Sequence, residues 1–251
     1  MAENSKIEWT ESTWNPVTGC AKISDGCLNC YAEKLALRLK EMGQKKYVNG
    51  FNVTLHPETI NEPLKWKKPR MVFVCSMSDL FHKDIPDEFV LKVFETMNKA
   101  THHIFQVLTK RPQRLFEMKN DIDWSENIWI GTTVESEKYA YRIKYIEEIP
   151  ARVKFLSLEP LLGPIHNINL NGINWVIVGG ESGPVSRPIK KEWITDIKDK
   201  CKEKNIPFFF KQWGGVNRKK AGKELDGKIF TEMPAKSTTR NNTPTATCCL
   251  F

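Results

Sequence analysis

Short runs of β-branched and aromatic residues alternate along this chain with longer segments that have a helical period. The helical patterns cover about residues 87–99, 112–118, 136–147 and 191–204, and Pro86 and Pro112 suit the starts of the first two. Because parallel strands need long crossover connections, the alternation predicts βαβ units and one parallel sheet that right-handed crossovers curl toward a barrel. The strand-like runs cover residues 72–75, 104–108, 128–132, 153–158, 175–178 and 207–211.

Length and composition favour a single α/β domain. With 251 residues, of which 40% are hydrophobic, the chain can build one sizeable core, which we expect over residues 1–235. No apolar run approaches the length of a membrane span, and the first residues lack the basic and apolar regions of a secretory signal. Seven cysteines in such a chain fit a reducing compartment. We therefore expect a cytoplasmic protein with no membrane partner.

The C-terminal segment, residues 236–251, is polar and has no period, which predicts a disordered tail. Its last residues, CCLF, formally fit a prenylation signal with Cys248 as the acceptor. No polybasic stretch supports that signal and a short match of this kind is common, so chance explains it better.

Small, hydroxylated and acidic residues recur where successive predicted strands end. Ligand sites of parallel α/β folds lie at the carboxyl ends of the strands, so these positions are candidates for one shared site. Taken alone, each position also fits turn and helix-cap chemistry, which requires the same residue types. Their recurrence at one strand end after another favours the shared site. The candidates are Ser76, Asp79, Lys110, Glu135, Glu159 and Glu181.

Three cysteines near the N-terminus carry the strongest chemical signal. Cys20, Cys27 and Cys30 follow a C-x6-C-x2-C pattern, and a helical pattern begins directly after them at Tyr31. A structural zinc site requires four protein ligands, and no fourth Cys or His stands nearby in the sequence. Three ligands leave one coordination position open, as a reactive centre requires, which favours a [4Fe–4S] cluster. A zinc site completed from afar and three unconnected buried cysteines are the alternatives.

The formal net charge of +8 is concentrated in a few basic clusters. Together with Trp9, Trp14, Trp66 and Trp213, these clusters would suit phosphate contacts and base stacking in a nucleic-acid interface. Solvated surface lysine and core tryptophan are the competing interpretations, and we expect at least Trp14 and Trp175 in the core. The clusters are Lys65, Lys67, Lys68 and Arg70; Lys110, Arg111 and Arg114; and Arg218, Lys219, Lys220 and Lys223.

Several long motifs in order resemble the phage Gp37/Gp68 family, the three-Cys-motif proteins of phages and bacteria. The resemblance covers about residues 7–215 and rests on IEWTESTWNPVTGCAKISDGCLNCYAE, SMSDLFH, LTKRPQR, FLSLEPLLGP, WVIVGGESGP and FFFKQWGG. That family in turn looks like a divergent branch of the radical S-adenosylmethionine (SAM) enzymes, closest to the spore photoproduct lyase group. The chain departs from the usual C-x3-C-x2-C spacing, and SMSDLF replaces the usual GGE-type motif after the second strand.

The resemblance implies a partial (β/α)6 barrel of the TIM-like radical SAM type, with a cluster on the three cysteines and SAM bound across the strand ends. Reduction of the cluster, by a protein such as flavodoxin or ferredoxin, would cleave SAM to methionine and a 5′-deoxyadenosyl radical that abstracts hydrogen from the substrate. Lys110 would meet the SAM carboxylate or a substrate phosphate. The SAM ammonium or ribose would be bound among Ser76, Asp79, Glu135, Glu159 and Glu181.

Cys75 is the candidate catalytic residue. In photoproduct lyases a cysteine just before a T-S-D motif returns a hydrogen atom to the product radical, and here Cys75 precedes S-M-S-D. Because side chains alternate along a strand, the extra residue would turn this thiol to the opposite face unless a bulge intervenes. A buried structural cysteine is the competing interpretation.

The sequence thus predicts a radical SAM-type enzyme that acts on an unidentified substrate, with nucleic acid as one candidate class. The alternative is a non-catalytic, metal-stabilised nucleic-acid-binding protein. A hydrolase is disfavoured because the five histidines suggest no nucleophile–base pair. His82 lies closest to the proposed site, but a lone histidine after a strand is more often structural.

Overall fold

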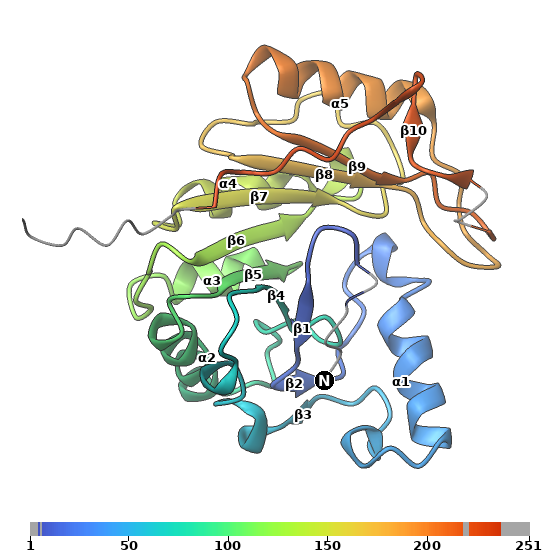
Figure 1. The fold of residues 1–251 in the computed structure, drawn as a ribbon. Helices are drawn as coiled ribbons and strands as arrows, with labels where there is room; N and C mark the ends of the chain where they lie inside the picture. Colours follow the sequence, from blue (N-terminus) through green and yellow to red (C-terminus); the bar gives the residue numbers. More distant parts are fainter. Residues whose placement is uncertain (1–4, 6, 218–220, 237–251) are drawn as a thin grey trace, which may run out of the picture.

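The computed structural model describes residues 5, 7–217 and 221–236 (Figure 1). Nearly all of the segment 236–251 predicted as a disordered tail lies outside this range, as do Cys248, Arg218, Lys219 and Lys220. No helix within the described ranges is long and apolar enough to cross a membrane.

One curled, wholly parallel sheet of seven strands forms the framework, and it opens as a half-barrel between edge strands β1 and β9 (Figure 1). All six predicted strands are present, with ends shifted by a residue or so. The predicted (β/α)6 count was too low, because the three-residue β1, within a polar stretch, gives almost no period to read. The strands in sheet order are β1 (Ser12–Trp14), β4 (Met71–Val74), β5 (Ile104–Thr109), β6 (Ile128–Thr133), β7 (Val153–Leu158), β8 (Trp175–Gly179) and β9 (Phe208–Gln212).

Helices cover the outer face of this sheet. The predicted helix at 136–147 is in fact a 3-10 segment, η5 (Glu137–Arg142), followed by the short α4 (Ile143–Glu147). The connection between β7 and β8, residues 159–174, contains no helix. The remaining helices are α1 (Tyr31–Glu41), α2 (Asp87–Lys99), α3 (Pro112–Glu117) and α5 (Lys191–Glu203), with short 3-10 turns η1 (Asp25–Cys27), η2 (Lys45–Tyr47), η3 (Pro57–Thr59) and η4 (Pro63–Lys65).

Two small antiparallel pairs complete the described structure. β2 (Val17–Thr18) pairs with β3 (Thr54–Leu55), and β10 (Glu224–Leu225) pairs with β11 (Lys228–Ile229). The first pair matters for the site, because the segment with the three cysteines begins directly after β2.

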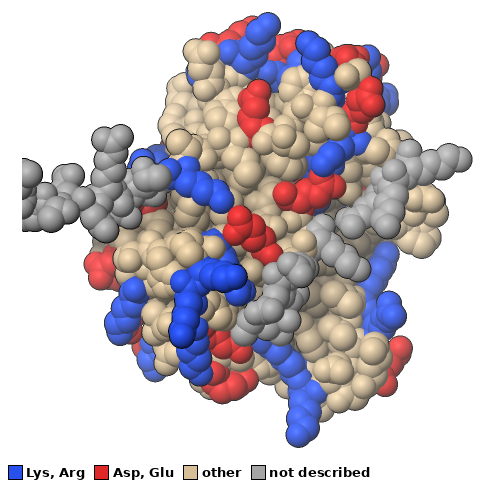
Figure 2. Space-filling model, viewed as in Figure 1, with Lys and Arg blue, Asp and Glu red and all other residues tan. Residues whose placement is uncertain are grey.

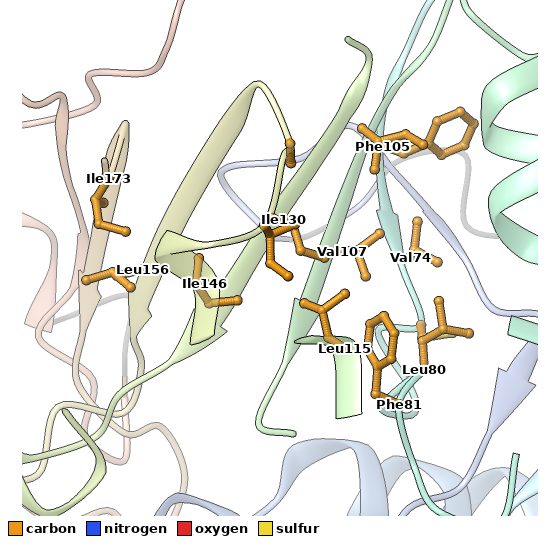
Figure 3. Packing of buried hydrophobic residues seen from close by; sticks show 14 of the residues in the cluster. Val74, Leu80, Phe81, Phe105, Val107, Leu115, Ile130, Ile146, Leu156 and Ile173 are labelled. Atoms are coloured by element: carbon orange, nitrogen blue, oxygen red, sulfur yellow. The ribbon is translucent and has the colours of Figure 1, made fainter. Parts of the chain in front are cut away.

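The strands bury apolar side chains on both faces, as parallel strands do. On the outer face Val74, Val107 and Ile130, from neighbouring strands, belong to one cluster with Leu115 of α3 and Ile146 of α4 (Figure 3). Full burial of such a side chain contributes about 1.5–3 kcal/mol. The outer cluster therefore holds the helices against the sheet and keeps the strands in place.

Aromatic side chains fill the concave face. Trp175 lies between Trp9, Phe155 and Phe209, at ring-centroid distances of 6.3, 5.7 and 6.1 Å. Trp175 is fully buried at 0% exposure, and the predicted core position of Trp14 is likewise confirmed at 1%. Because these rings occupy the interior of the half-barrel, open space remains at the carboxyl ends of the strands.

Candidate metal centre

The three cysteines lie on the segment that joins β2 to α1. Cys20 follows β2, Cys27 ends η1, and Cys30 is the N-cap residue of α1. The turn before Cys20 needs glycine: Gly19 has φ of 82°, and a Cβ there would lie 2.1 Å from the Asn52 carbonyl oxygen. Its amide donates to the Met77 carbonyl at 3.0 Å, which ties the start of the cysteine segment to the end of β4.

A cavity of about 430 Å³ lies where this segment meets the carboxyl ends of the strands, a volume within the range of small-molecule sites. The strand-end rule is thereby supported, because the cavity collects residues from β4, β5, β6, β7 and β9, and residues that follow β8, together with all three cysteines. Of the predicted site residues, only Glu135 does not line it. The predicted residues that do are Cys20, Cys27, Cys30, Cys75, Ser76, Asp79, Lys110, Glu159 and Glu181.

The donor set fits an iron–sulfur cluster. Cys20, Cys27 and Cys30 are free thiols, half-buried on one side of the cavity. Among the described residues, no three His, Cys, Asp or Glu side chains are grouped so as to hold a single metal ion. A [4Fe–4S] cluster does not require that grouping, because each thiolate binds a different iron. Three thiols that line one cavity are the donor set that such a cluster would use.

The thiols of Cys20 and Cys27 have different electrostatic surroundings. Burial and then the nearby Asp79 carboxylate raise the pKa of Cys20 above its ordinary value, although Arg111 opposes them. Burial acts in the same direction on Cys27, but the Lys110 ammonium and hydrogen bonds from Ile23 and Ser24 outweigh it, so that the pKa of Cys27 is lowered. Cys27 is therefore the more readily ionised of the two.

Asp79 is fully engaged by protein groups. Its carboxylate accepts hydrogen bonds from the Thr109 hydroxyl at 2.7 Å and from the Lys110 and Phe81 amides at 3.0 and 3.1 Å. It also forms an ion pair with Arg111 at 2.9 Å. The carboxylate thus joins the ends of β4 and β5 and leaves little capacity for a ligand.

Glu135 lies behind the cysteine segment rather than in the cavity. It is fully buried at 0% exposure and pairs with the equally buried Arg142 at 2.8 Å. Its other oxygen accepts a short hydrogen bond from Ser24. A Cβ on Gly26 would lie 2.6 Å from this carboxylate, so the segment passes directly over it.

Glu181 and Glu159 each form an ion pair with a basic side chain, but their other contacts differ. The Glu181 carboxylate accepts from the Arg187 guanidinium and from Asn29, whose amide lies 3.0 Å away. Burial alone would raise the pKa of Glu181, yet these donors lower it. Glu159 instead pairs with Lys211 at 2.7 Å and accepts from the Trp9 indole at 3.3 Å.

Lys110 differs from the other charged groups of the cavity. Its ammonium donates to the Thr133 hydroxyl at 3.5 Å, and among the described residues no carboxylate lies within 4.0 Å of it. Arg111 and Lys211, in contrast, each have a carboxylate partner. Lys110 is therefore a cation available to an anionic ligand or to the cysteine thiolates.

Ser76 and Cys75 follow β4. The Ser76 hydroxyl donates to the Asn15 side chain at 3.2 Å, and its carbonyl accepts from the Tyr31 hydroxyl at 2.6 Å. Cys75 has a φ of 58°, so the regular alternation of β4 ends at Val74 and cannot be extended to this thiol. The thiol is 2% exposed, packs with the outer core, and still lines the cavity.

Alkylation of the metal-free protein should distinguish the reactive thiol of Cys27 from the unreactive thiol of Cys75. Burial raises the pKa of Cys75 to about 12, whereas that of Cys27 lies below its ordinary value. Because the thiolate is the nucleophile, iodoacetamide at neutral pH should label Cys27 first and leave Cys75 unlabelled. Peptide mass spectrometry measures both, with urea-unfolded protein as the control in which both react. Equal labelling of the folded protein would contradict the assignment.

Sequence reasoning missed the basic partners of the carboxylates. The sequence pattern marks Arg111 only as part of a basic cluster and does not single out Arg142, Arg187 or Lys211. Each of these residues pairs with an acidic candidate of the site. An arginine placed shortly after a strand-end carboxylate, as in the seven-residue step from Glu135 to Arg142, was the available signal.

Three of the four tryptophans expected at a nucleic-acid surface are buried. Trp9 and Trp66, like Trp14, are buried, with 3% and 8% exposure. Arg114 donates to backbone carbonyls and pairs with Asp87. On the face shown in Figure 2, basic and acidic side chains are interspersed rather than separated. The stacking interpretation is therefore wrong for Trp9 and Trp66, which lie in the core together with Trp14, whose core position was expected.

His82 is a structural residue, as expected. It is 2% exposed, and burial lowers its pKa below the ordinary value. Its Nδ1 accepts from the Asp84 amide at 3.2 Å, which shapes the turn before α2. It does not line the cavity.

Comparison with known proteins gives a family but no activity. Residues 4–234 match a family described as a protein of unknown function, DUF5131. Neither the search of curated proteins nor the search of solved structures found a match. The matched range includes the three cysteines, every strand of the sheet and the whole cavity lining. The chain therefore belongs to the DUF5131 family.

Proposed function

We propose that this protein is a [4Fe–4S] enzyme of the radical SAM type, related to the phage Gp37/Gp68 proteins. The observation that carries the proposal is the cavity, because three free thiols and the ends of five parallel strands line the same space. A half-barrel of parallel strands with its ligand site at their carboxyl ends agrees with this function.

In this proposal Cys20, Cys27 and Cys30 hold the cluster and leave one iron without a protein ligand. A cluster held by these cysteines would supply the electron for reductive cleavage of SAM. The protein residues bind and orient SAM and the substrate and exclude water. The rings of Trp9 and Phe73, which belong to the buried aromatic cluster, would keep water from the side of the cavity that they line.

Among the predicted SAM contacts, Lys110 and Glu159 are the best placed. Lys110 has no carboxylate partner among the described residues and would bind the SAM carboxylate or a substrate phosphate. Glu159 faces the cavity beside Trp9, with Lys211 as its counter-ion. Asp79 and Glu181 would act mainly on the cysteine segment, because protein donors already occupy their carboxylates.

Cys75 is proposed as the hydrogen-atom donor to the product radical. Such a donor must carry its proton, and burial, which raises the pKa of Cys75 to about 12, keeps the thiol protonated. The thiol also reaches the cavity that holds the cysteine segment. Replacement of Cys75 with alanine should change the final product but leave SAM cleavage intact; unchanged turnover would remove Cys75 from the mechanism.

A reductant protein such as flavodoxin or ferredoxin would deliver the electron, in the cytoplasm. The substrate is unidentified, and nucleic acid is one proposed class. With Trp9, Trp14 and Trp66 buried, such a substrate would have to bind without them.

The decisive experiment is anaerobic reconstitution with iron and sulfide, followed by reduction with dithionite in the presence of SAM. We expect a brown protein with about four irons and four sulfides per chain, and 5′-deoxyadenosine detected by mass spectrometry. A reaction without protein and one without dithionite are the controls. A colourless protein that retains zinc and forms no 5′-deoxyadenosine would instead support the metal-stabilised binding protein.

A further inference from the structure

The cysteine segment is held by side chains from strand ends far away in the sequence. Three carboxylates surround it, namely Asp79 after β4, Glu135 after β6 and Glu181 at the end of β8. Each of them is paired with an arginine. The contacts described below run from these pairs to residues 20–29, and none of them involves a metal.

Arg111 makes the contact closest to a cysteine. One end of its guanidinium, Nη1, lies 2.9 Å from Asp79 Oδ2 and 3.5 Å from the Cys20 sulfur. The other end, Nη2, donates to the Ala21 carbonyl at 2.9 Å. A single planar fork thus binds the carboxylate, the thiol and the backbone next to that thiol.

The base of this arrangement is rigid. Asp79 is 6% exposed, and the Thr109 hydroxyl and two backbone amides fix its carboxylate. The Thr109 hydroxyl also accepts from the Arg111 amide at 2.8 Å, so both partners of the ion pair are held from the end of β5. Arg111 is itself only 14% exposed. The guanidinium therefore has a defined position before any ligand binds.

A second pair holds the other end of the segment. Arg187 donates to the Asp25 carbonyl at 3.0 Å while it pairs with Glu181. Glu181 in turn accepts from the Asn29 side chain, which lies between Cys27 and Cys30. The segment is thus bound on both sides of Cys27 by arginine–carboxylate pairs.

We propose that Arg111 is a positioning residue for the metal centre: anchored on Asp79, it holds Cys20 and the adjoining backbone in the metal-binding conformation, and its N–H donated to the Cys20 sulfur favours the more negatively charged, reduced form of the bound cluster. This inference rests on the proposed function only in treating Cys20 as a metal ligand. Outer-shell donors of this kind typically change metal affinity about 10- to 100-fold.

The first test uses metal-free protein. Hydrogen exchange of residues 19–29, followed by mass spectrometry, should become about tenfold faster in Arg111→Gln, because the segment loses its anchor. The matched control is Arg152→Gln, which breaks an arginine–carboxylate pair with Glu126 on the surface and should leave the exchange of this segment unchanged. Unchanged exchange in Arg111→Gln would overturn the proposal whether or not the protein binds a cluster.

The second test uses reconstituted protein and measures the midpoint potential by EPR-monitored titration. Hydrogen bonds to ligand sulfur raise the potential of a cluster, so Arg111→Gln should shift it downward. Arg111→Lys keeps the charge and should restore part of the shift, which also covers the case in which the Gln variant does not fold. A potential that is equal in wild type and both variants would overturn the proposal. Absence of iron from the wild type would overturn the proposed function and with it the role of Arg111 toward a metal, whereas the exchange measurement on metal-free protein would still decide whether Arg111 anchors the segment.

Discussion

Replacing Cys27 with serine is expected to abolish the proposed cluster. Cys27 ends η1, lines the cavity, and has a pKa lowered by Lys110 and neighbouring donors, so its thiolate forms readily for iron. A serine hydroxyl is a much poorer ligand for iron at neutral pH because it stays protonated. Removal of an outer-shell partner already costs about 10- to 100-fold in metal affinity, and loss of a ligand should exceed that. Iron uptake and SAM cleavage should both fall to background.

Cys201→Ala is the matched control for this substitution. Cys201 is also a free cysteine, but it is fully buried in α5 and packs in the outer core away from the cavity. The control should keep its iron, and any loss of unfolding free energy should reflect core packing alone. Iron and sulfide assays with the visible spectrum measure the difference. A Cys27→Ser protein with full cluster content would show that the three cysteines are not the ligands.

The sequence predicted those parts of the fold that follow from local pattern. The strand 153–158 and the helix 87–99 matched to the residue, because each carries a clear apolar period over enough residues. The 136–147 segment kept its apolar period, yet its first half formed a 3-10 turn that carries Tyr139 and Arg142 into buried contacts. Tertiary packing decided the helix type there, which periodicity does not report.

In the candidate site, too, some features follow from the sequence and others are set by tertiary structure. That the strand ends share one site follows from the topology of parallel sheets, and that the cysteine segment lies beside them is what the family resemblance implies; the cavity agrees with both. The roles of the carboxylates did not follow, because their partners are set by tertiary structure. Arg187 reaches across to Asp25, 162 positions away along the chain. No local period encodes such a contact, so the sequence alone predicts Asp79, Glu135 and Glu181 as ligand-binding groups and does not reveal the arginines that pair with them.

Replacing Arg142 with methionine is expected to cause a large loss of stability. Arg142 is 1% exposed and pairs at 2.8 Å with Glu135, which is 0% exposed. It also donates to the Thr133 carbonyl at 2.8 Å, and its guanidinium lies 4.5 Å from the centre of the Tyr139 ring. Methionine fills similar volume but leaves the Glu135 carboxylate buried without its counter-ion. Breaking a buried pair from one side costs about 3–5 kcal/mol.

Urea unfolding of the metal-free proteins measures this free energy directly. The double variant Arg142→Met/Glu135→Leu should recover a substantial part of the loss, since it removes the unpaired charge together with its partner. Arg152→Gln, which breaks the exposed pair with Glu126, should cost no more than about 1 kcal/mol. Because Glu135 also accepts from Ser24, the single variant should speed hydrogen exchange around Ser24 as well. If Arg142→Met unfolds like the Arg152 control, the Glu135 carboxylate is neutral or hydrated rather than held by this pair, and its support of the cysteine segment fails with it.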